Sequence, residues 1–452
     1  VGNFRDSSGV ITVTNTAAIA RVQVNSLPNN QGSPGNAVGA ITLPSDVDTT
    51  LYLGAYDQFS NYIGDVVGTW TASGTLDSTK LSPKSGSASV FNPKVAGQTG
   101  RIYARYQTFS DSTNGAVSVI TGNLNFVQVQ SARTGIGSKV GTLSITTDSN
   151  QTKLFAAGYD KDSNYVRGVK VSWSVLGGIG ITSPASSADS TVFNARRVGQ
   201  GQLQADSSSL SAITGLITVS FGDTAFINLR SGSNNGGVVY KTSPLTMPSD
   251  SSLKGYAAGY DLDSNYVGDV RARFDSSFGG SAGLQGFVSD SNTSVTYNPS
   301  KVGAGKIRAR YFNNGGSGYL RDTTNVITVN TGAASQLIVE TLRNGSGTQQ
   351  GAVVKTADDS LTVYAALRDN DGNFIGLSSG ASWSVSGGIG TLVNLTGDSV
   401  RIRFTTTGSG QLTAVGGIFT GNTGTITVNP GVLASVELRT DTLNTGVHAG
   451  TF

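Results

Sequence analysis

Acidic and amide side chains recur at alternate positions of one short motif, and they are the residues of this chain best suited to bind an ion. The motif occurs as Asp160-x-Asp162-x-Asn164, Asp261-x-Asp263-x-Asn265 and Asp369-x-Asp371-x-Asn373. Calcium is bound by about six to eight oxygens, and alternating Asp and Asn side chains in a turn supply such ligands. The spacing therefore resembles the beginning of a calcium-binding loop.

A plain turn is the other interpretation of this motif. No Glu follows at the twelfth position, where a calcium loop of this kind places a bidentate ligand, and Phe59 replaces the second Asp in a further copy that begins at Asp57. We interpret the motif as a hairpin turn in which Asp caps backbone N–H groups. Its Asn residues are expected near left-handed backbone geometry: Asn61, Asn164, Asn265 and Asn373. We thus predict no metal-binding or cofactor-binding residue and no cofactor, with calcium at these turns as the alternative.

Catalytic chemistry finds little support in the residue types. His448 is the only histidine and there is no cysteine, which removes His-based triads, multi-histidine metal sites and thiol chemistry. A carboxylate pair of the glycosidase kind would be expected once, whereas most acidic residues here fall in repeated turns. We predict that the chain is not an enzyme and has no catalytic residue.

Two basic strands, Arg101 to Arg105 and Lys306 to Arg310, place tyrosines beside arginines. Such a cluster is compatible with a nucleic-acid or anionic-glycan surface. The net charge is only +3, and the other copies of the repeat lack the cluster. We therefore interpret these strands as solvated outer faces whose charge discourages edge pairing, and predict no nucleic-acid partner.

The acidic turns belong to a longer cassette that the chain repeats four times. It reads YDQFSNYIGDVVGTW, YDKDSNYVRGVKVSW, YDLDSNYVGDVRARF and RDNDGNFIGLSSGASW, and its first aspartates, Asp57, Asp160, Asp261 and Asp369, are 103, 101 and 108 residues apart. This period exceeds the roughly 20–50 residues of a solenoid unit and suits a whole immunoglobulin-like sandwich.

Two further blocks accompany each cassette. A hairpin with paired glycines follows it, at Gly97 and Gly100, Gly199 and Gly201, Gly303 and Gly305, and Gly408 and Gly410, where glycine permits a positive φ. An apolar closing strand ends each repeat. Apolar and polar residues alternate along these segments, which is typical of β-strands, and one large aromatic recurs at an equivalent position that we expect in each core: Trp70, Trp173, Phe274 and Trp383.

These blocks predict an all-β chain of tandem immunoglobulin-like β-sandwiches arranged as an extended rod. The domains are expected at 17–123, 124–222, 223–331 and 332–430, here called repeats 1 to 4. Residues 1–16 match the C-terminal strands of a preceding domain, and residues 431–452 match the N-terminal strand of a following one. We expect a segment cut from a longer array; exchange of these strands between chains is the alternative.

The pattern resembles the bacterial immunoglobulin-like (Big) domains of invasin/intimin-type adhesins and other large surface proteins. The matching features are the Asp-x-x-Ser/Gly-Asn turn, the aromatic, the glycine hairpin and the closing Ile-Thr-Val. The resemblance covers all four repeats and implies the shaft of such a protein more than an adhesive tip, because no tip domain is recognisable.

Function follows from this organisation. We predict an extracellular structural protein that forms a rod or fibre on a bacterial cell surface, as an adhesin stalk or a filament or sheath component. Four repeats of roughly 40 Å would reach on the order of 150 Å. Expected partners are neighbouring copies or adjoining repeats, without membrane insertion, since no stretch approaches about 20 apolar residues.

One alternative function is a module that binds host protein or glycan, best placed in repeat 3 with its SNNGG and FNNGGSGY insertions. The other is an accessory domain set of a polysaccharide-active enzyme.

Overall fold

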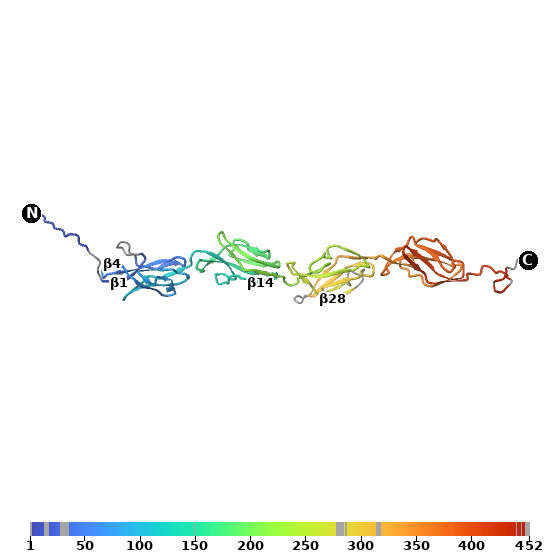
Figure 1. The fold of residues 1–452 in the computed structure, drawn as a ribbon, viewed down its shortest axis with the longest axis horizontal. Coiled ribbons are helices and arrows are strands. Elements are labelled where there is room, and N and C mark those ends of the chain that lie inside the picture. The colour runs from blue at the N-terminus through green and yellow to red at the C-terminus, as the bar shows by residue number, and fades with distance from the viewer. Residues whose placement is uncertain are drawn as a thin grey trace. The chain divides into compact units, whose positions relative to one another are not determined.

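The computed structural model describes residues 2–12, 18–27, 36–149, 151–276, 284, 287–312, 318–439, 441–443 and 445–447. The chain divides into two compact units, residues 1–222 and 223–452, and each holds two of the four repeats (Figure 1). Apart from one 3-10 turn, Ser78–Lys80, every element of regular structure in the described residues is a β-strand. The predicted all-β fold is confirmed.

Repeat 1 shows how the alternating sequence builds a sandwich. Its first strand pairs antiparallel with the long third strand, and a second sheet system packs its apolar face against them. Strand β2 instead pairs parallel with the closing strand β12. The strands are β1 Arg21–Asn25, β2 Ile41–Pro44, β3 Thr49–Tyr56, β4 Tyr62–Asp65, β5 Gly68–Ala72, β6 Leu81–Ser82, β7 Ser85–Gly86, β8 Ala88–Phe91, β9 Thr99–Gly100, β10 Ile102–Tyr106, β11 Phe109–Ser112 and β12 Val117–Ile120.

Repeat 2 has two five-stranded sheets, β13-β15-β19-β18 with β16 on β15, and β14-β22-β20-β17 with β21 on β20. Its strands are β13 Phe126–Gln130, β14 Leu143–Thr146, β15 Thr152–Tyr159, β16 Tyr165–Gly168, β17 Ser172–Leu176, β18 Gly180–Ser183, β19 Ser190–Ala195, β20 Gly199–Asp206, β21 Ser211–Ile213 and β22 Ile217–Ser220.

In repeats 3 and 4, as in repeat 2, the first strand pairs antiparallel with the third, and the second pairs parallel with the last. Repeat 3 contains β23 Phe226–Arg230, β24 Leu245–Pro248, β25 Leu253–Tyr260, β26 Tyr266–Asp269, β27 Ala272–Asp275, β28 Val288–Asn292, β29 Ser294–Tyr297, β30 Gly303–Gly305, β31 Arg308–Phe312, β32 Tyr319–Thr323 and β33 Ile327–Asn330. Repeat 4 contains β34 Ala334–Glu340, β35 Val353–Thr356, β36 Ser360–Asp369, β37 Phe374–Leu377, β38 Ser382–Val385, β39 Gly390–Val393, β40 Ser399–Phe404, β41 Gly408–Gly410, β42 Leu412–Gly416, β43 Phe419–Asn422 and β44 Ile426–Asn429.

Each repeat buries its own apolar core around the recurring aromatic. Trp70, Trp173, Phe274 and Trp383 are 2%, 4%, 0% and 4% exposed. The three indole N–H groups each donate to a backbone carbonyl, at Gly86, Ala188 and Gly397. The predicted core position is therefore confirmed in all four repeats, and burial of one large side chain per sandwich supplies a sizeable part of its stability.

The basic strand of repeat 3 differs from the prediction. Arg308 and Arg310 do not simply project into solvent, because both form ion pairs with Asp275, at 3.0 and 2.9 Å. Asp275 lies on the neighbouring strand β27 and is itself buried, so it needs these cations. In repeat 1, Arg101 and Arg105 are exposed as expected.

The terminal segments form no strand in residues 2–12 and 432–438. Their apolar side chains are exposed, including Val10, Ile11, Val432, Leu433, Val436 and Leu438. Their assignment to neighbouring domains stays a prediction.

Candidate functional site: the joints between repeats

The Asp-to-Asn turn is a compact cap that folds within one repeat. In repeat 1, Asp57 Oδ1 accepts the N–H groups of Phe59 and Asn61, both at 2.8 Å. The Asn61 side-chain amide donates to Asp57 Oδ2 at 2.9 Å. Corresponding bonds close the turns of the other three repeats, at Asp160, Asp261 and Asp369. The predicted Asp cap is confirmed.

The left-handed residue of the turn is not the Asn, so that prediction is wrong. Positive φ angles occur one position earlier, at 66° for Ser60, 69° for Ser163 and Ser264, and 83° for Gly372. The Asn side chain is occupied with the Asp carboxylate, and the tight turn before it requires the left-handed backbone. Gly372, the residue type that tolerates this geometry, was the sequence signal for the correct position.

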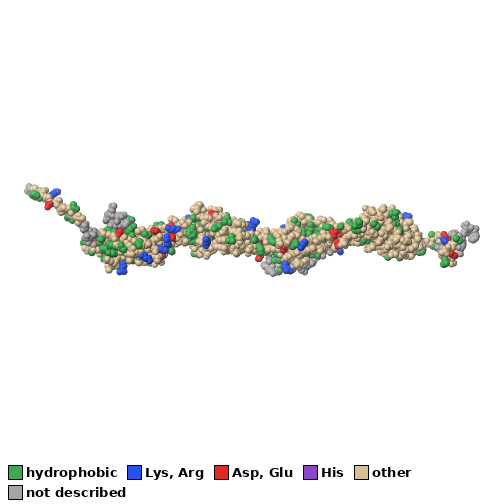
Figure 2. All heavy atoms as spheres, in the orientation of Figure 1, with side chains coloured by type: hydrophobic (Ala, Val, Ile, Leu, Met, Phe, Trp, Pro, Cys, Tyr) green, Lys and Arg blue, Asp and Glu red, His purple; other side chains and the backbone are tan. Residues whose placement is uncertain are grey.

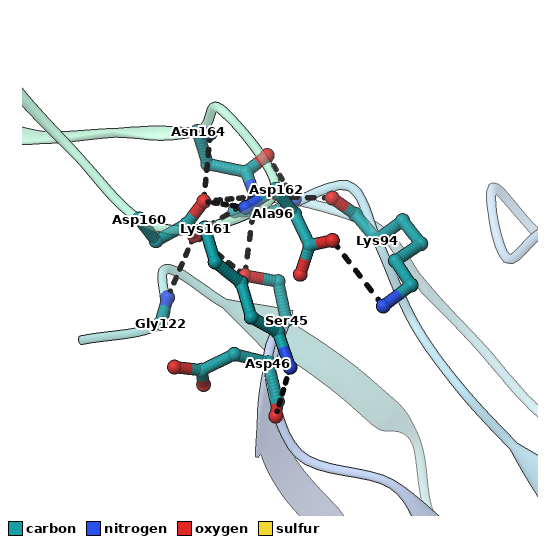
Figure 3. A network of polar contacts seen from close by, with 9 residues as sticks. All are labelled: Ser45, Asp46, Lys94, Ala96, Gly122, Asp160, Lys161, Asp162 and Asn164. Carbon is teal, nitrogen blue, oxygen red and sulfur yellow. Dashed lines mark hydrogen bonds and ion pairs between the residues drawn. The ribbon is translucent and has the colours of Figure 1, made fainter. Parts of the chain in front are cut away.

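Asp160 also connects repeat 2 to repeat 1, at the junction here called joint 1/2 (Figure 3). Its Oδ2 atom accepts the Ser45 hydroxyl at 2.6 Å and the Gly122 N–H at 2.9 Å. Ser45 follows β2 of repeat 1, and Gly122 follows β12. The residues after the C-terminal ends of these two parallel strands therefore bind the same carboxylate. Asp160 is fully buried by this arrangement.

Asn164 forms the second part of joint 1/2. Its side-chain amide donates to the Lys94 carbonyl at 3.0 Å, and its Oδ1 accepts the Ala96 N–H at 2.9 Å. The pairing imitates the two bonds that a strand residue would make, because an Asn side chain carries one donor and one acceptor side by side. One amide therefore holds the loop after β8 in register with the turn of repeat 2.

Charged groups surround this pair of contacts in Figure 3. Lys94 pairs with Asp162 at 3.2 Å, and the Lys161 ammonium donates to the Asp46 carbonyl at 3.1 Å. The Asp46 carboxylate accepts the N–H of Asn123 at 3.0 Å, which caps the linker itself. The second Asp of the motif thus serves as an ion-pair partner in this joint.

The second unit repeats the arrangement at the junction of repeats 3 and 4, here called joint 3/4. Asp369 Oδ2 accepts the Ser249 hydroxyl at 2.7 Å and the Gly332 N–H at 2.9 Å. Asn373 donates to the Ser300 carbonyl at 3.2 Å and accepts the Val302 N–H at 3.4 Å. The same residue types at the same places show that the contact belongs to the repeat, not to one junction.

The hydrogen bonds determine the charge state of the two buried carboxyls. Burial acts to raise the pKa of Asp160, but the bonds from Ser45, Gly122 and Asn164 outweigh it and lower that pKa to about 2. At Asp369, burial is likewise outweighed by bonds from Asn373, Gly332 and Ser249, so its pKa lies well below the usual range. Both carboxylates are ionised at neutral pH, when they accept most strongly.

Sequence reasoning found the turn but missed its partners. Ser45 and Ser249 stand in the short sequence Pro-Ser-Asp, at Pro44 to Asp46 and Pro248 to Asp250. Its recurrence in two repeats, together with a glycine just after each closing strand, was the available signal. The residues look like ordinary turn formers, and only the fold brings them to the carboxylate of the next repeat.

The acidic turns place hydrogen-bond donors around their first aspartate. No group of three or more His, Asp or Glu side chains within the described ranges is placed to hold a metal ion. The carboxylate oxygens of Asp160 and Asp369 accept hydrogen bonds from N–H and O–H groups. Whether calcium affects the fold stays a prediction, and His448 and residues 313–317 of the FNNGGSGY insertion lie outside the described residues.

Comparisons with known proteins find similarity in structure alone. No protein-family model matches the chain, and no curated protein matches its sequence. The resemblance to Big domains therefore stays a prediction.

No helix in the described part of the chain has the length and apolar character required to cross a membrane.

Several solved structures of tandem β-sandwich proteins are similar to this chain. Extracellular cadherin domains 3–6 of protocadherin gamma B2 match at 13% identity over 88% of this chain and 99% of that one, with a TM-score of 0.34. The Escherichia coli adhesin FdeC matches at 12% identity over 68% and 99%, with a TM-score of 0.28. The surface layer protein SbsC, domains 1–6, matches at 13% identity over 91% and 58%, with a TM-score of 0.22. Because these scores are below 0.5, the functions of those proteins are not transferred to this chain.

Proposed function

We propose that this chain is a structural segment of an extracellular protein, a rod or fibre on a bacterial cell surface in which short joints hold successive sandwiches in a defined orientation. The observation that carries the proposal is the buried carboxylate at joints 1/2 and 3/4, where Asp160 and Asp369 accept donors from the preceding repeat. A flexible string of domains would not need such a contact.

The linkers support the same proposal. Strand β12 ends at Ile120 and β13 begins at Phe126, while β33 ends at Asn330 and β34 begins at Ala334. Such short connections leave little chain for one repeat to fold back on its neighbour, unlike a long Gly/Ser tether. Joint orientation is then set by bonds across the linker as well as by its length.

The surface suits an extracellular structural role. On the face seen in Figure 2, Lys, Arg, Asp and Glu side chains gather near joint 1/2. Charged residues make up 13% of the chain, Gly contributes 61 residues and Cys none. A polar surface with a weak net field permits rods to pack side by side.

Small-angle X-ray scattering on the whole chain tests the proposal. We expect a maximum dimension on the order of 150 Å, from about 40 Å per repeat and joint. A dimension near that of a single globule would rule out the rod and the spacer function with it. Saturable binding of a host protein or glycan to repeat 3 alone would favour the adhesin-module alternative instead.

A further inference from the structure

In each sandwich the first strand lies beside the second strand of a hairpin without forming a ladder with it; these pairs are β1 and β11, β13 and β21, β23 and β32, and β34 and β43. The repeats close the edge between these two strands in different ways. In repeat 1, the Val24 N–H donates to Asp111 Oδ2 at 2.7 Å, which bridges β1 and β11. In repeat 3, the Leu229 N–H donates to Asp322 Oδ2 at 2.6 Å, which bridges β23 and β32. An aspartate carboxylate thus takes the place of a missing ladder bond.

A threonine that recurs in all four repeats identifies which residues are equivalent to Asp111 and Asp322. The hydroxyls of Thr113, Thr214, Thr324 and Thr423 accept the N–H groups of Ile102, Leu203, Ile307 and Leu412. The residue two positions before each threonine is therefore equivalent, and it is Asp111, Ala212, Asp322 and Gly421 in repeats 1 to 4.

Repeat 4 closes the edge by direct contact. A Cβ atom at Gly421 would lie 2.4 Å from the Leu337 carbonyl oxygen, so β43 and β34 approach too closely for any side chain. No carboxylate is required there, because no space is left between the strands.

Repeat 2 has neither the carboxylate nor the close approach. Between β13 and β21 runs a groove of about 460 Å³, lined by Phe126, Val127, Val129, Lys139, Ala212 and Ile213 among others. Val129 corresponds to Val24, because the carbonyls of both accept the N–H of the next segment, from Val140 at 2.9 Å and Val38 at 3.0 Å. The amide and carbonyl of one strand residue point to the same side, so the Val129 N–H faces the groove, where Ala212 offers it no acceptor.

The groove combines three features that an acidic side chain requires. The Val129 N–H is a donor at the position where Asp111 binds in repeat 1, and the exposed Lys139 supplies a positive charge at the rim. Phe126 and Ile213 provide apolar surface for the methylene stem. We propose that this groove binds an Asp or Glu side chain presented by an extended peptide segment of a partner protein.

A peptide fits this site better than a free acid. Val127 lies two residues before Val129 on the same edge of β13, so its backbone groups also face outward and match the period of an extended chain. In repeats 1 and 3 the group that fills the position is itself an Asp on a β-strand. The site does not depend on whether the chain forms a rod.

Titration of the full chain, labelled with ¹⁵N-valine, with an end-blocked peptide of residues 108–114 tests the proposal. This peptide, TFSDSTN, carries Asp111 in its native strand sequence. We expect a saturable shift of the Val129 amide resonance, and binding at least about tenfold weaker for the same peptide with Asn in place of Asp, since hydrogen bonds to a charged group are the stronger ones. Equal binding of both peptides, or no saturable shift at Val129, would overturn the proposal.

Variants at position 212 separate binding from folding. Ala212→Asp places the chain's own carboxylate in the groove and should abolish peptide binding, whereas the matched control Ala212→Ser should retain it. If Ala212→Asp fails to fold, Lys139→Gln removes only the exposed positive charge at the rim and should weaken peptide binding. Binding that survives in a folded Ala212→Asp protein, or an unchanged peptide affinity in Lys139→Gln, contradicts the assignment.

Discussion

Asp57 and Asp160 occupy the same turn in two different settings. Both accept N–H groups of their own turn, but Asp160 also accepts Ser45 and Gly122 from the preceding repeat. The pKa of Asp57 is already lowered, chiefly by its hydrogen bond with Asn61. The turn therefore closes without help from a joint, so its own hydrogen bonds are enough to order it.

Acid should weaken joint 1/2 only at very low pH. The folded-state pKa of Asp160 is about 2, below its ordinary value of 3.8. A lowered pKa contributes stability that is fully present above the ordinary value and is lost as the pH falls through the folded value, here between about pH 4 and pH 2. Carboxyl ¹³C NMR titration measures this directly; titration of Asp160 near 3.8 would contradict the buried, donor-rich site.

The core aromatic of repeat 2 should be costly to truncate. Trp173→Ala removes a buried side chain and its bond to Ala188, and should cost about 3–5 kcal/mol, mainly in the unfolding of repeat 2. Trp173→Phe is the matched control, because repeat 3 has Phe274 at this position. Chemical denaturation of both variants measures the difference. A loss below about 1 kcal/mol for Trp173→Ala would contradict the core assignment.

At the scale of elements, the paired glycines have two separate roles. In repeats 1, 2 and 4 the first has a positive φ, 85° at Gly97, 151° at Gly199 and 150° at Gly408, as the sequence pattern predicts for them. The second permits a close approach of strands. A Cβ at Gly201 would lie 2.1 Å from the Leu176 carbonyl oxygen, at the point where β20 leaves one strand partner for another.

Substitution of the second glycine should therefore destabilise its repeat. Gly201→Ala forces β17 and β20 apart and should cost about 1–3 kcal/mol, since added volume in a packed site strains the backbone. Gly141→Ala, in the same repeat but with no atom within 4 Å of the new Cβ, should change stability by less than about 0.5 kcal/mol. Thermal unfolding compares the two variants, and equal effects would show that the strand approach is not the reason for the glycine.

The elements were predictable from the sequence where a local rule determines them. Alternation along segments such as Lys306 to Tyr311 predicts strands, and the recurring Trp predicts the core. The role of Arg308 and Arg310 was not predictable, because their partner Asp275 lies far away in sequence on β27. Likewise Ala212 signals an open edge only after the fold shows what Asp111 does in repeat 1.

At the scale of the whole molecule, the joints are expected to work without calcium. The charged carboxylates of Asp160 and Asp369 are stabilised by hydrogen bonds from uncharged donors, and repeat 1 keeps the turn with Phe59 in place of the second Asp. Thermal melting of the whole chain should therefore be the same with calcium and with a chelator. Destabilisation of repeats 2, 3 and 4 but not repeat 1 on chelation would instead support calcium binding at the Asp-x-Asp-x-Asn turns.

Loss of one hydroxyl should loosen joint 1/2 while leaving both sandwiches folded. The N–H of Ser45 donates to the Ile120 carbonyl, and the N–H of Ala357 donates to the Asn429 carbonyl at the equivalent place in repeat 4, so alanine fits this corner. Ser45→Ala nevertheless removes a donor from a buried carboxylate, which costs about 1–3 kcal/mol, and the pKa of Asp160 should rise from about 2 toward its ordinary value. Backbone ¹⁵N relaxation should then report more independent tumbling of repeats 1 and 2. Ser85→Ala, exposed on β7, is the matched control, and an unchanged Asp160 pKa with unchanged relaxation in Ser45→Ala would show that the joint does not set the orientation of the repeats.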